Sequence, residues 1–360
     1  MEIPMVDWLS VTVDIQGYEL GARNIIKELE ALKKQASEFR TNHIHDKIFF
    51  NIGDQTFEVY ANGAIGYAYI LRNHLMEIKL AKFRSTNEDN YPIFVHFSSE
   101  FLWSFGPEKA WYWFKDWIEQ NIGSVYKNKL NRVDLCCHTD CILFKMDDLN
   151  SFKGRFRNKR INIEDKDLTG FEFGSRSSGT IFLRIYDKSK EVFKKKDKLW
   201  FLEIWQKYGL EHSNVWNIEY QLNRDIFKEM KIETCEDLFN KLGILWEYLT
   251  QEWSVLVDET STRLERSNPT KEWITLQKAY KNYQCEGFIT RKKQADCHLD
   301  ALLLSAMGYF TSMLALSKVN NLEEGMMKFL KDGIKALALK GKDINHIIEM
   351  KRKLYGLEVS

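Results

Sequence analysis

Three segments in the middle of the chain alternate between polar and apolar side chains with a period of two residues. They cover residues 130–140, 180–188 and 215–224. Such alternation is typical of a β-strand with one face buried. Shorter strands are predicted over 8–14, 47–60, 66–71 and 93–97.

Apolar residues at helical spacing predict helices over 21–39, 107–122 and 200–208. A fourth helical pattern covers 236–252, and strand signals are few after that point. Hairpin-like pairs of strands are more evident than alternating βαβ units. We therefore predict an α+β fold with an antiparallel sheet core and covering helices, followed by an α-helical C-terminal region. The predicted domains are 1–235 and 236–360.

The polar faces of the three central strands carry the side chains best suited to chemistry. Tyr186 lies between Arg184 and Lys188, each about 6.5–7 Å away along the strand. That spacing suits a phosphate held between two cations and a phenol oxygen. Asp134 and Glu219 occupy mid-strand positions on the other two polar faces, where Asp in particular is disfavoured. If the strands pair in one sheet, these oxygens converge, and they suit Mg²⁺ or Mn²⁺.

Ordinary structural roles are the alternatives for the same residues. Tyr186 would then be a partly exposed strand tyrosine between solubilising charges. Asp134 and Glu219 would be carboxylates bonded to a neighbouring arginine, such as Arg132 or Arg224.

Charge is unevenly distributed along the chain. The net charge is only +1, yet residues 151–198 hold 14 Lys and Arg against seven Asp and Glu. Clustered cations beside the tyrosine strand are what an electrostatic DNA footprint requires, whereas solvated loop charge is the alternative. The candidate DNA contacts are Arg155, Arg157, Lys159, Arg160 and, in the glycine-bounded turn at 174–179, Arg176.

The six cysteines do not form a disulfide-like pattern, and the first residues lack a leader-like apolar stretch. We therefore expect a cytoplasmic protein without a membrane partner. Two other metal patterns were weighed. Cys136, His138 and Cys141 lack a second zinc-ligand pair, and the stretch from His43 to His45 lies in a polar connection before a strand.

The segments RVDLCCHTD, TGFEFGSRSSGTIFLRIYDKSKE and VWNIEYQLNRDIF, in this order, resemble the replication initiation factor family. The segments DWLSVTVD and IFVHFSSEFLW add to the resemblance, which spans about the first 250 residues. The family comprises rolling-circle Rep proteins of plasmids, related phage proteins and relaxases of integrative conjugative elements. One departure is Asn217, where the family pattern leads us to expect a basic residue.

The resemblance implies an endonuclease that nicks one strand of origin DNA. Tyr186 would form a 5′-phosphotyrosine and leave a free 3′-OH. Asp134 and Glu219 would hold the divalent metal, with Asp14 or Asp140 as a third ligand. The alternative is a non-catalytic, sequence-specific DNA-binding initiator.

The helical region after residue 235 shows no nucleophile or ligand constellation, so we expect it to serve binding or assembly. Its cluster Arg291, Lys292 and Lys293 favours DNA. A second copy in a homodimer and a host helicase are the other partners left open.

Overall fold

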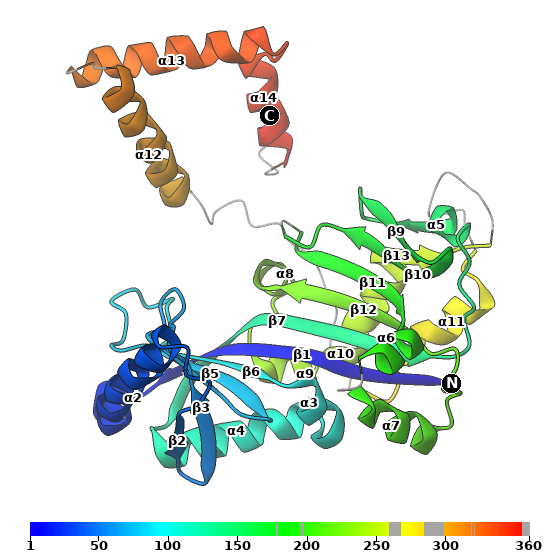
Figure 1. Cartoon of the computed structure of the whole chain (residues 1–360). Helices are drawn as coiled ribbons and strands as arrows, with labels where there is room; N and C mark the ends of the chain where they lie inside the picture. Colours follow the sequence, from blue (N-terminus) through cyan, green and yellow to red (C-terminus); the bar gives the residue numbers. More distant parts are fainter. Residues whose placement is uncertain are drawn as a thin grey trace. The chain divides into compact units, whose positions relative to one another are not determined.

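The computed structural model describes residues 1–177, 179–195, 198–258, 268–283, 299–317, 319 and 321–354. The chain forms two compact units, Met1–Thr290 and Arg291–Ser360. The first unit contains the sheet and the second contains three helices (Figure 1).

One antiparallel sheet of eleven strands is the framework of the first unit (Figure 1). Its order is β2-β3-β4-β5-β6-β1-β7-β12-β11-β10-β9. In chain order, the strands are β1 (Glu2–Ile15), β2 (Phe49–Ile52), β3 (Gln55–Val59), β4 (Tyr69–Arg72), β5 (Met76–Leu80), β6 (Ile93–Phe97), β7 (Val125–Thr139), β9 (Lys159–Glu164), β10 (Asp167–Gly174), β11 (Ile181–Asp187) and β12 (Trp216–Asn223). A separate pair joins β8 (Phe152–Gly154) to β13 (Ser254–Leu256).

Helices of the first unit cover this sheet. They are α1 (Tyr18–Gly21), α2 (Arg23–Thr41), α3 (Ser99–Phe105), α4 (Pro107–Asn121), α5 (Asp148–Ser151), α6 (Lys188–Lys194), α7 (Trp200–Tyr208), α8 (Arg224–Met230), α9 (Cys235–Phe239), α10 (Leu242–Glu247), the π-helix η2 (Tyr248–Trp253) and α11 (Lys271–Gln277). The predicted α+β class with an antiparallel sheet core is confirmed.

Strand alternation decides which face of the sheet is apolar. Val133 and Leu135 of β7 and Ile218 of β12 lie in the main hydrophobic core. The intervening residues face the other side, where Cys136 joins a smaller core with Phe201 of α7. The polar side chains of the central strands therefore lie on one face, beside α6 and α7.

Two strand predictions differ in detail from the structure. The segment 47–60 is a hairpin of β2 and β3, because Gly53 adopts the positive φ of 58° that reverses the chain. The strand predicted over 180–188 ends at Asp187. There the Asp187 side chain accepts a hydrogen bond from the Lys190 amide and caps α6, so Lys188 begins a helix.

Residues after 235 are part of the first unit up to about residue 283. Trp246 of α10 packs against Tyr220 of β12 with ring centroids 5.5 Å apart. Tyr280 donates hydrogen bonds to the backbone oxygens of Met5 and Cys136. The compact units accordingly divide at Thr290, whereas the prediction set the domain boundary after 235.

The second unit consists of α12 (Leu299–Ser317), α13 (Leu322–Leu339) and α14 (Ile344–Leu354). Phe310 and Phe329 join α12 to α13 edge to face, with centroids 5.6 Å apart. The helical character predicted for this region is confirmed, and the cluster 291–293 lies outside the described residues. Among the described helices, none has the length and apolar character needed to span a bilayer.

Candidate functional site

The register of three adjacent strands brings the predicted site residues together. On β12, Glu219 pairs with Arg184 of β11, and Gln221, two residues further on, pairs with Asp134 of β7. Tyr186 pairs with Asn217. We call the resulting cavity the tyrosine pocket; it has a volume of about 580 Å³. Its lining includes Asp134, Arg184, Tyr186 and Glu219.

The Tyr186 hydroxyl is the centre of a hydrogen-bond network. It donates to Glu219 Oε2 at 3.2 Å. It accepts from Asn217 Nδ2 at 2.9 Å and from Lys188 Nζ at 3.3 Å. Burial, followed by the charge of Glu219, raises the Tyr186 pKa well above its usual value. In the free protein the phenol therefore keeps its proton, which points toward a carboxylate.

Each of the two central carboxylates has its own arginine partner. Arg184 Nη2 bonds Glu219 Oε1. Arg132 bonds both oxygens of Asp134, at 2.8 and 2.5 Å. The structural alternative foreseen for Asp134, a bond to Arg132, is thus present; the partner of Glu219 is Arg184 from the neighbouring strand.

Asp134 and Glu219 are nearly inaccessible, with 2% and 1% of their surface exposed. Burial, together with the nearby Glu219 charge, raises the pKa of Asp134 to about 8 despite Arg132. Burial also acts to raise the pKa of Glu219, but Arg184 overcomes it and holds that pKa below its usual value. Glu219 is the charged member of the pair, and Asp134 holds a proton at neutral pH.

Asp7 of β1 lines the pocket and was missed by the sequence reasoning, which named Asp14 on the same strand. A β-bulge between Val6 and Trp8 leaves Asp7 out of the strand pairing. Asp7 accepts hydrogen bonds from Ser99 Oγ at 2.5 Å and Trp103 Nε1 at 2.6 Å. Bulges are not visible in a two-residue period, so the alternation pattern gave no signal for Asp7.

Trp8 and His96 support Arg132 at another part of the pocket wall. The Trp8 and His96 rings stack with centroids 3.6 Å apart, and the Arg132 guanidinium lies 4.2 Å from the Trp8 ring. Burial lowers the His96 pKa to about 4. His96 is therefore neutral at pH 7 and does not repel the arginine.

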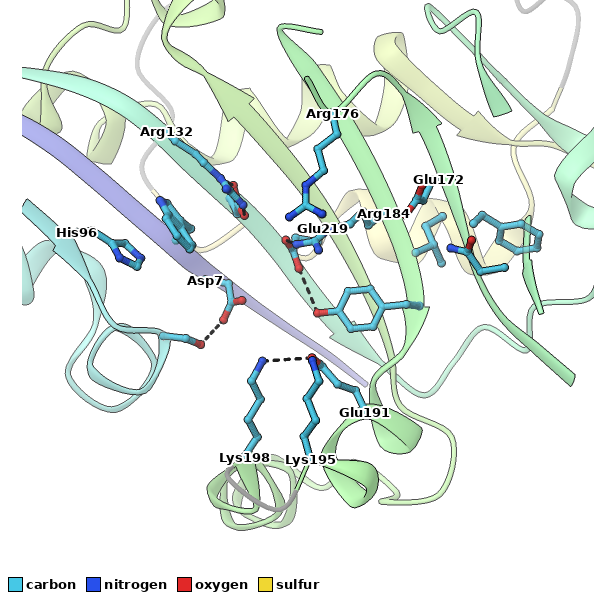
Figure 2. Close-up of a pocket in the computed structure, with 17 residues that line it drawn as sticks. Asp7, His96, Arg132, Glu172, Arg176, Arg184, Glu191, Lys195, Lys198 and Glu219 are labelled. Carbon is cyan, nitrogen blue, oxygen red and sulfur yellow. Dashed lines mark hydrogen bonds and ion pairs between the residues drawn. The ribbon is translucent and has the colours of Figure 1, made fainter. Parts of the chain in front are cut away.

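A lysine cluster on Glu191 completes the wall near Tyr186, as Figure 2 shows. Glu191 Oε2 accepts from Lys188 at 2.8 Å, and Oε1 accepts from Lys195 at 3.2 Å and Lys198 at 3.3 Å. Burial acts to raise the pKa of Glu191, but the lysines, Lys188 first, lower it to about 2. Lys188 has no exposed surface; burial acts to lower its pKa, and Asp7 and Glu191 raise it above its usual value.

The two predicted third ligands lie elsewhere. Asp14 bonds Arg84 at 2.6 Å, near the far end of β1. Asp140 accepts hydrogen bonds from the Met1 amino group at 2.6 Å and from the Glu211 amide at 3.1 Å. Neither lines the tyrosine pocket. Within the described part of the chain, no three His, Cys, Asp or Glu side chains form a metal-binding group.

Four of the five predicted DNA contacts line a second hollow, which we call the basic depression. It has a volume of about 730 Å³ and contains Arg157, Lys159, Arg160 and Arg176. Arg176 also lines the tyrosine pocket and extends toward Glu219 (Figure 2). The fifth candidate, Arg155, lies outside this hollow and pairs with Glu252 at 2.8 Å.

The cations of the basic depression differ in their pairing. Arg160 lies 3.4 Å from Glu172, and Lys159 donates to the backbone oxygens of Leu149 and Phe152. Arg157 and Arg176 are exposed and have no ion pair with a residue in the described ranges. Their full charge faces solvent and is available to a polyanion.

The other metal patterns are separate from this site. His43 and His45 line a different depression with Asp46 and Glu58. Cys136 and His138 are buried, and the His138 Nδ1 accepts a hydrogen bond from Trp205 Nε1 at 3.0 Å. Cys141 bonds the Met1 amino group.

No family model and no curated protein matches the chain. Among solved structures, the chain is similar to a rolling circle replication initiator protein from Geobacillus stearothermophilus. The two share 15% sequence identity over 80% of this chain and all of that chain, with a TM-score of 0.44. A likeness at this level carries no conclusion about activity.

Proposed function

We propose that the chain is a rolling-circle replication initiator or relaxase that nicks one strand of origin DNA with Tyr186 as the nucleophile. The observation that supports this most is the hydroxyl of Tyr186, which lies in a pocket between Lys188, Asn217 and Glu219. A tyrosine held only for packing does not need two donors and a carboxylate at its oxygen.

The residues around Tyr186 match the needs of a phosphoryl transfer. The Tyr186 oxygen attacks the scissile phosphorus, the bond from phosphorus to the 3′ oxygen breaks, and the freed 3′ oxygen takes a proton from water. The phenol proton faces Glu219 Oε2, 3.2 Å away. Lys188 and Asn217 donate to the oxygen and stabilise negative charge as it develops there. Asn217 thus takes a place near the tyrosine where a basic residue was expected.

We propose that Asp134 and Glu219 hold one Mg²⁺ or Mn²⁺. Their ligand chemistry fits, because carboxylate and amide oxygens are the donors these ions prefer. Asn217 Oδ1 and Gln221 Oε1, on either side of Glu219 along β12, are buried and lack hydrogen-bond partners among the described residues. When bound, the ion would stabilise charge on the scissile phosphate. Arg132 and Arg184 would have to share these carboxylates with it.

The basic depression shares Glu172 and Arg176 with the tyrosine pocket, so it extends the surface available to a strand. We propose that it holds the phosphates of single-stranded origin DNA leading to the pocket. For the second unit we propose a role in duplex binding or assembly, with a second copy or a host helicase as the protein partner.

A nicking assay tests the proposal. Supercoiled origin DNA is incubated with the full chain and Mg²⁺, with a matched sample in chelator. Conversion of supercoiled to open circles only with metal supports the enzyme. If the chain binds origin DNA and leaves it uncut at every metal concentration, the non-catalytic DNA-binding initiator is the correct function.

A further inference from the structure

The lysine cluster on Glu191 has more positive charge than its carboxylate balances. Three lysine amines converge on one carboxylate, and two of them, from Lys195 and Lys198, contact the same oxygen, Oε1. By contrast, Arg132 and Arg184 in the same pocket each bond a carboxylate of their own. Lys195 and Lys198 are the less committed cations of the pocket wall.

These two lysines also differ from Lys188 in accessibility. Lys188 is fully buried, whereas the side chains of Lys195 and Lys198 are 60% and 29% exposed. Both line the tyrosine pocket, and in Figure 2 both extend from below toward Glu191. An anion entering the pocket can therefore reach them without displacing Lys188 from the Tyr186 hydroxyl.

We propose that Lys195 and Lys198 form a second phosphate subsite of the tyrosine pocket, which holds a phosphate next to the scissile one on the same strand. This inference rests on the proposed DNA-strand substrate. In the free protein, Glu191 occupies the position of that phosphate and keeps the two amines together. Several amines around one anionic oxygen group is the arrangement that a phosphate requires. When the strand enters, the amines transfer to the phosphate and Glu191 keeps its bond to Lys188.

Neighbouring lysines of α6 provide a matched control. Lys190 pairs with Asp167 at 3.2 Å, and Lys194 pairs with Glu164 at 2.5 Å. Neither lines the tyrosine pocket. A Lys190→Gln/Lys194→Gln variant removes the same charge from the same segment without touching the subsite.

The test is the salt dependence of single-strand binding. All proteins carry Tyr186→Phe so that no strand is cut, and each binds a fluorescent origin oligonucleotide at several salt concentrations. Each lost phosphate contact on a single strand lowers the slope of log K against log salt by about 0.7. Lys195→Gln/Lys198→Gln should lower the slope by about 1.4, and the control pair should leave it near the parent value.

Two results would overturn the subsite: an unchanged slope in Lys195→Gln/Lys198→Gln, or an equal decrease in the control pair. A thermal melt of each variant shows whether it is folded, and single substitutions replace a pair that is not. Failure of the parent Tyr186→Phe protein to bind any single strand is a different outcome, because it removes the proposed function itself.

Discussion

The tyrosine pocket and the basic depression share two residues of their walls, yet their charges are organised in opposite ways. In the pocket, Glu219 and Asp134 are buried and each bonds an arginine. In the depression, Arg157 and Arg176 are exposed and unpaired within the described residues. Fixed, paired charges suit the positioning of reacting groups, whereas free exposed charges suit attraction of a polyanion. The comparison therefore assigns chemistry to one hollow and strand binding to the other.

The largest effect is expected from the nucleophile itself. Tyr186→Phe keeps the ring and removes the attacking oxygen, so nicking should fall by roughly 10⁴-fold or more. Binding of the origin strand should persist, because the depression is untouched. Gel quantification of nicked circles and an equilibrium binding assay measure the two effects. Nicking at the parent rate would remove the chemistry from this pocket.

The next largest effect is expected from the paired carboxylates. Glu219→Gln and Asp134→Asn keep the shape of each side chain but remove charge that we propose binds the metal and orients Tyr186. Nicking at limiting Mg²⁺ should fall by about 10²–10³-fold, the range typical of a lost transition-state contact. Excess Mn²⁺ should recover part of the rate. If both variants nick normally at limiting metal, the carboxylates are structural partners of Arg132 and Arg184.

Charge removal in the basic depression should affect binding and leave chemistry intact. Arg157→Gln with Arg160→Gln should lower the salt slope of single-strand binding by about 1.4. The nicking rate at saturating DNA should stay within about twofold of the parent. Arg155→Gln is the matched control, since Arg155 pairs with Glu252 outside the depression. A fall in the saturated rate would mean that the two hollows do not divide the work as we propose.

The smallest effect is expected on stability against pH. The Asp134 carboxyl keeps its proton to about pH 8 in the folded chain, but loses it near about pH 4 when unfolded. Its stabilising contribution is therefore full below about pH 4 and is lost as pH rises toward 8. Glu219, whose pKa is lowered, has the opposite effect, at acid pH.

Asp134→Asn removes this titration while keeping a neutral polar group. Without divalent metal, its melting temperature should fall less than that of the parent between pH 5 and 9, by a few degrees. Thermal melts across that range measure the difference. Identical pH curves for the two proteins would show that Asp134 does not hold a proton in the folded chain.

The sequence predicted the convergence of Asp134, Glu219 and Tyr186 because each side chain lies on the polar face of a long alternating strand. It did not predict Asp7, since a bulge changes the side to which that residue points. Glu191, Lys195 and Lys198 were missed because a capped helix and a turn, rather than strand alternation, direct them to the pocket.

The boundary after residue 235 shows another limit of pattern reading. The change from strand to helix signals is real, but α9 to α11 complete the core of the first unit through Trp246, Trp273 and Tyr280. Periodicity indicates the type of each element, and the contacts that join elements far apart in sequence are not contained in it.

The most direct test of the central claim is the identity of the residue that becomes linked to DNA. The full chain is incubated with Mg²⁺ and a single-stranded origin oligonucleotide, and the covalent product is digested and sequenced by mass spectrometry. We predict one adduct, with the 5′ phosphate of the downstream fragment on Tyr186 and a free 3′-OH on the released fragment. Nicking with the adduct on another residue, or with no adduct on the protein, would contradict the account.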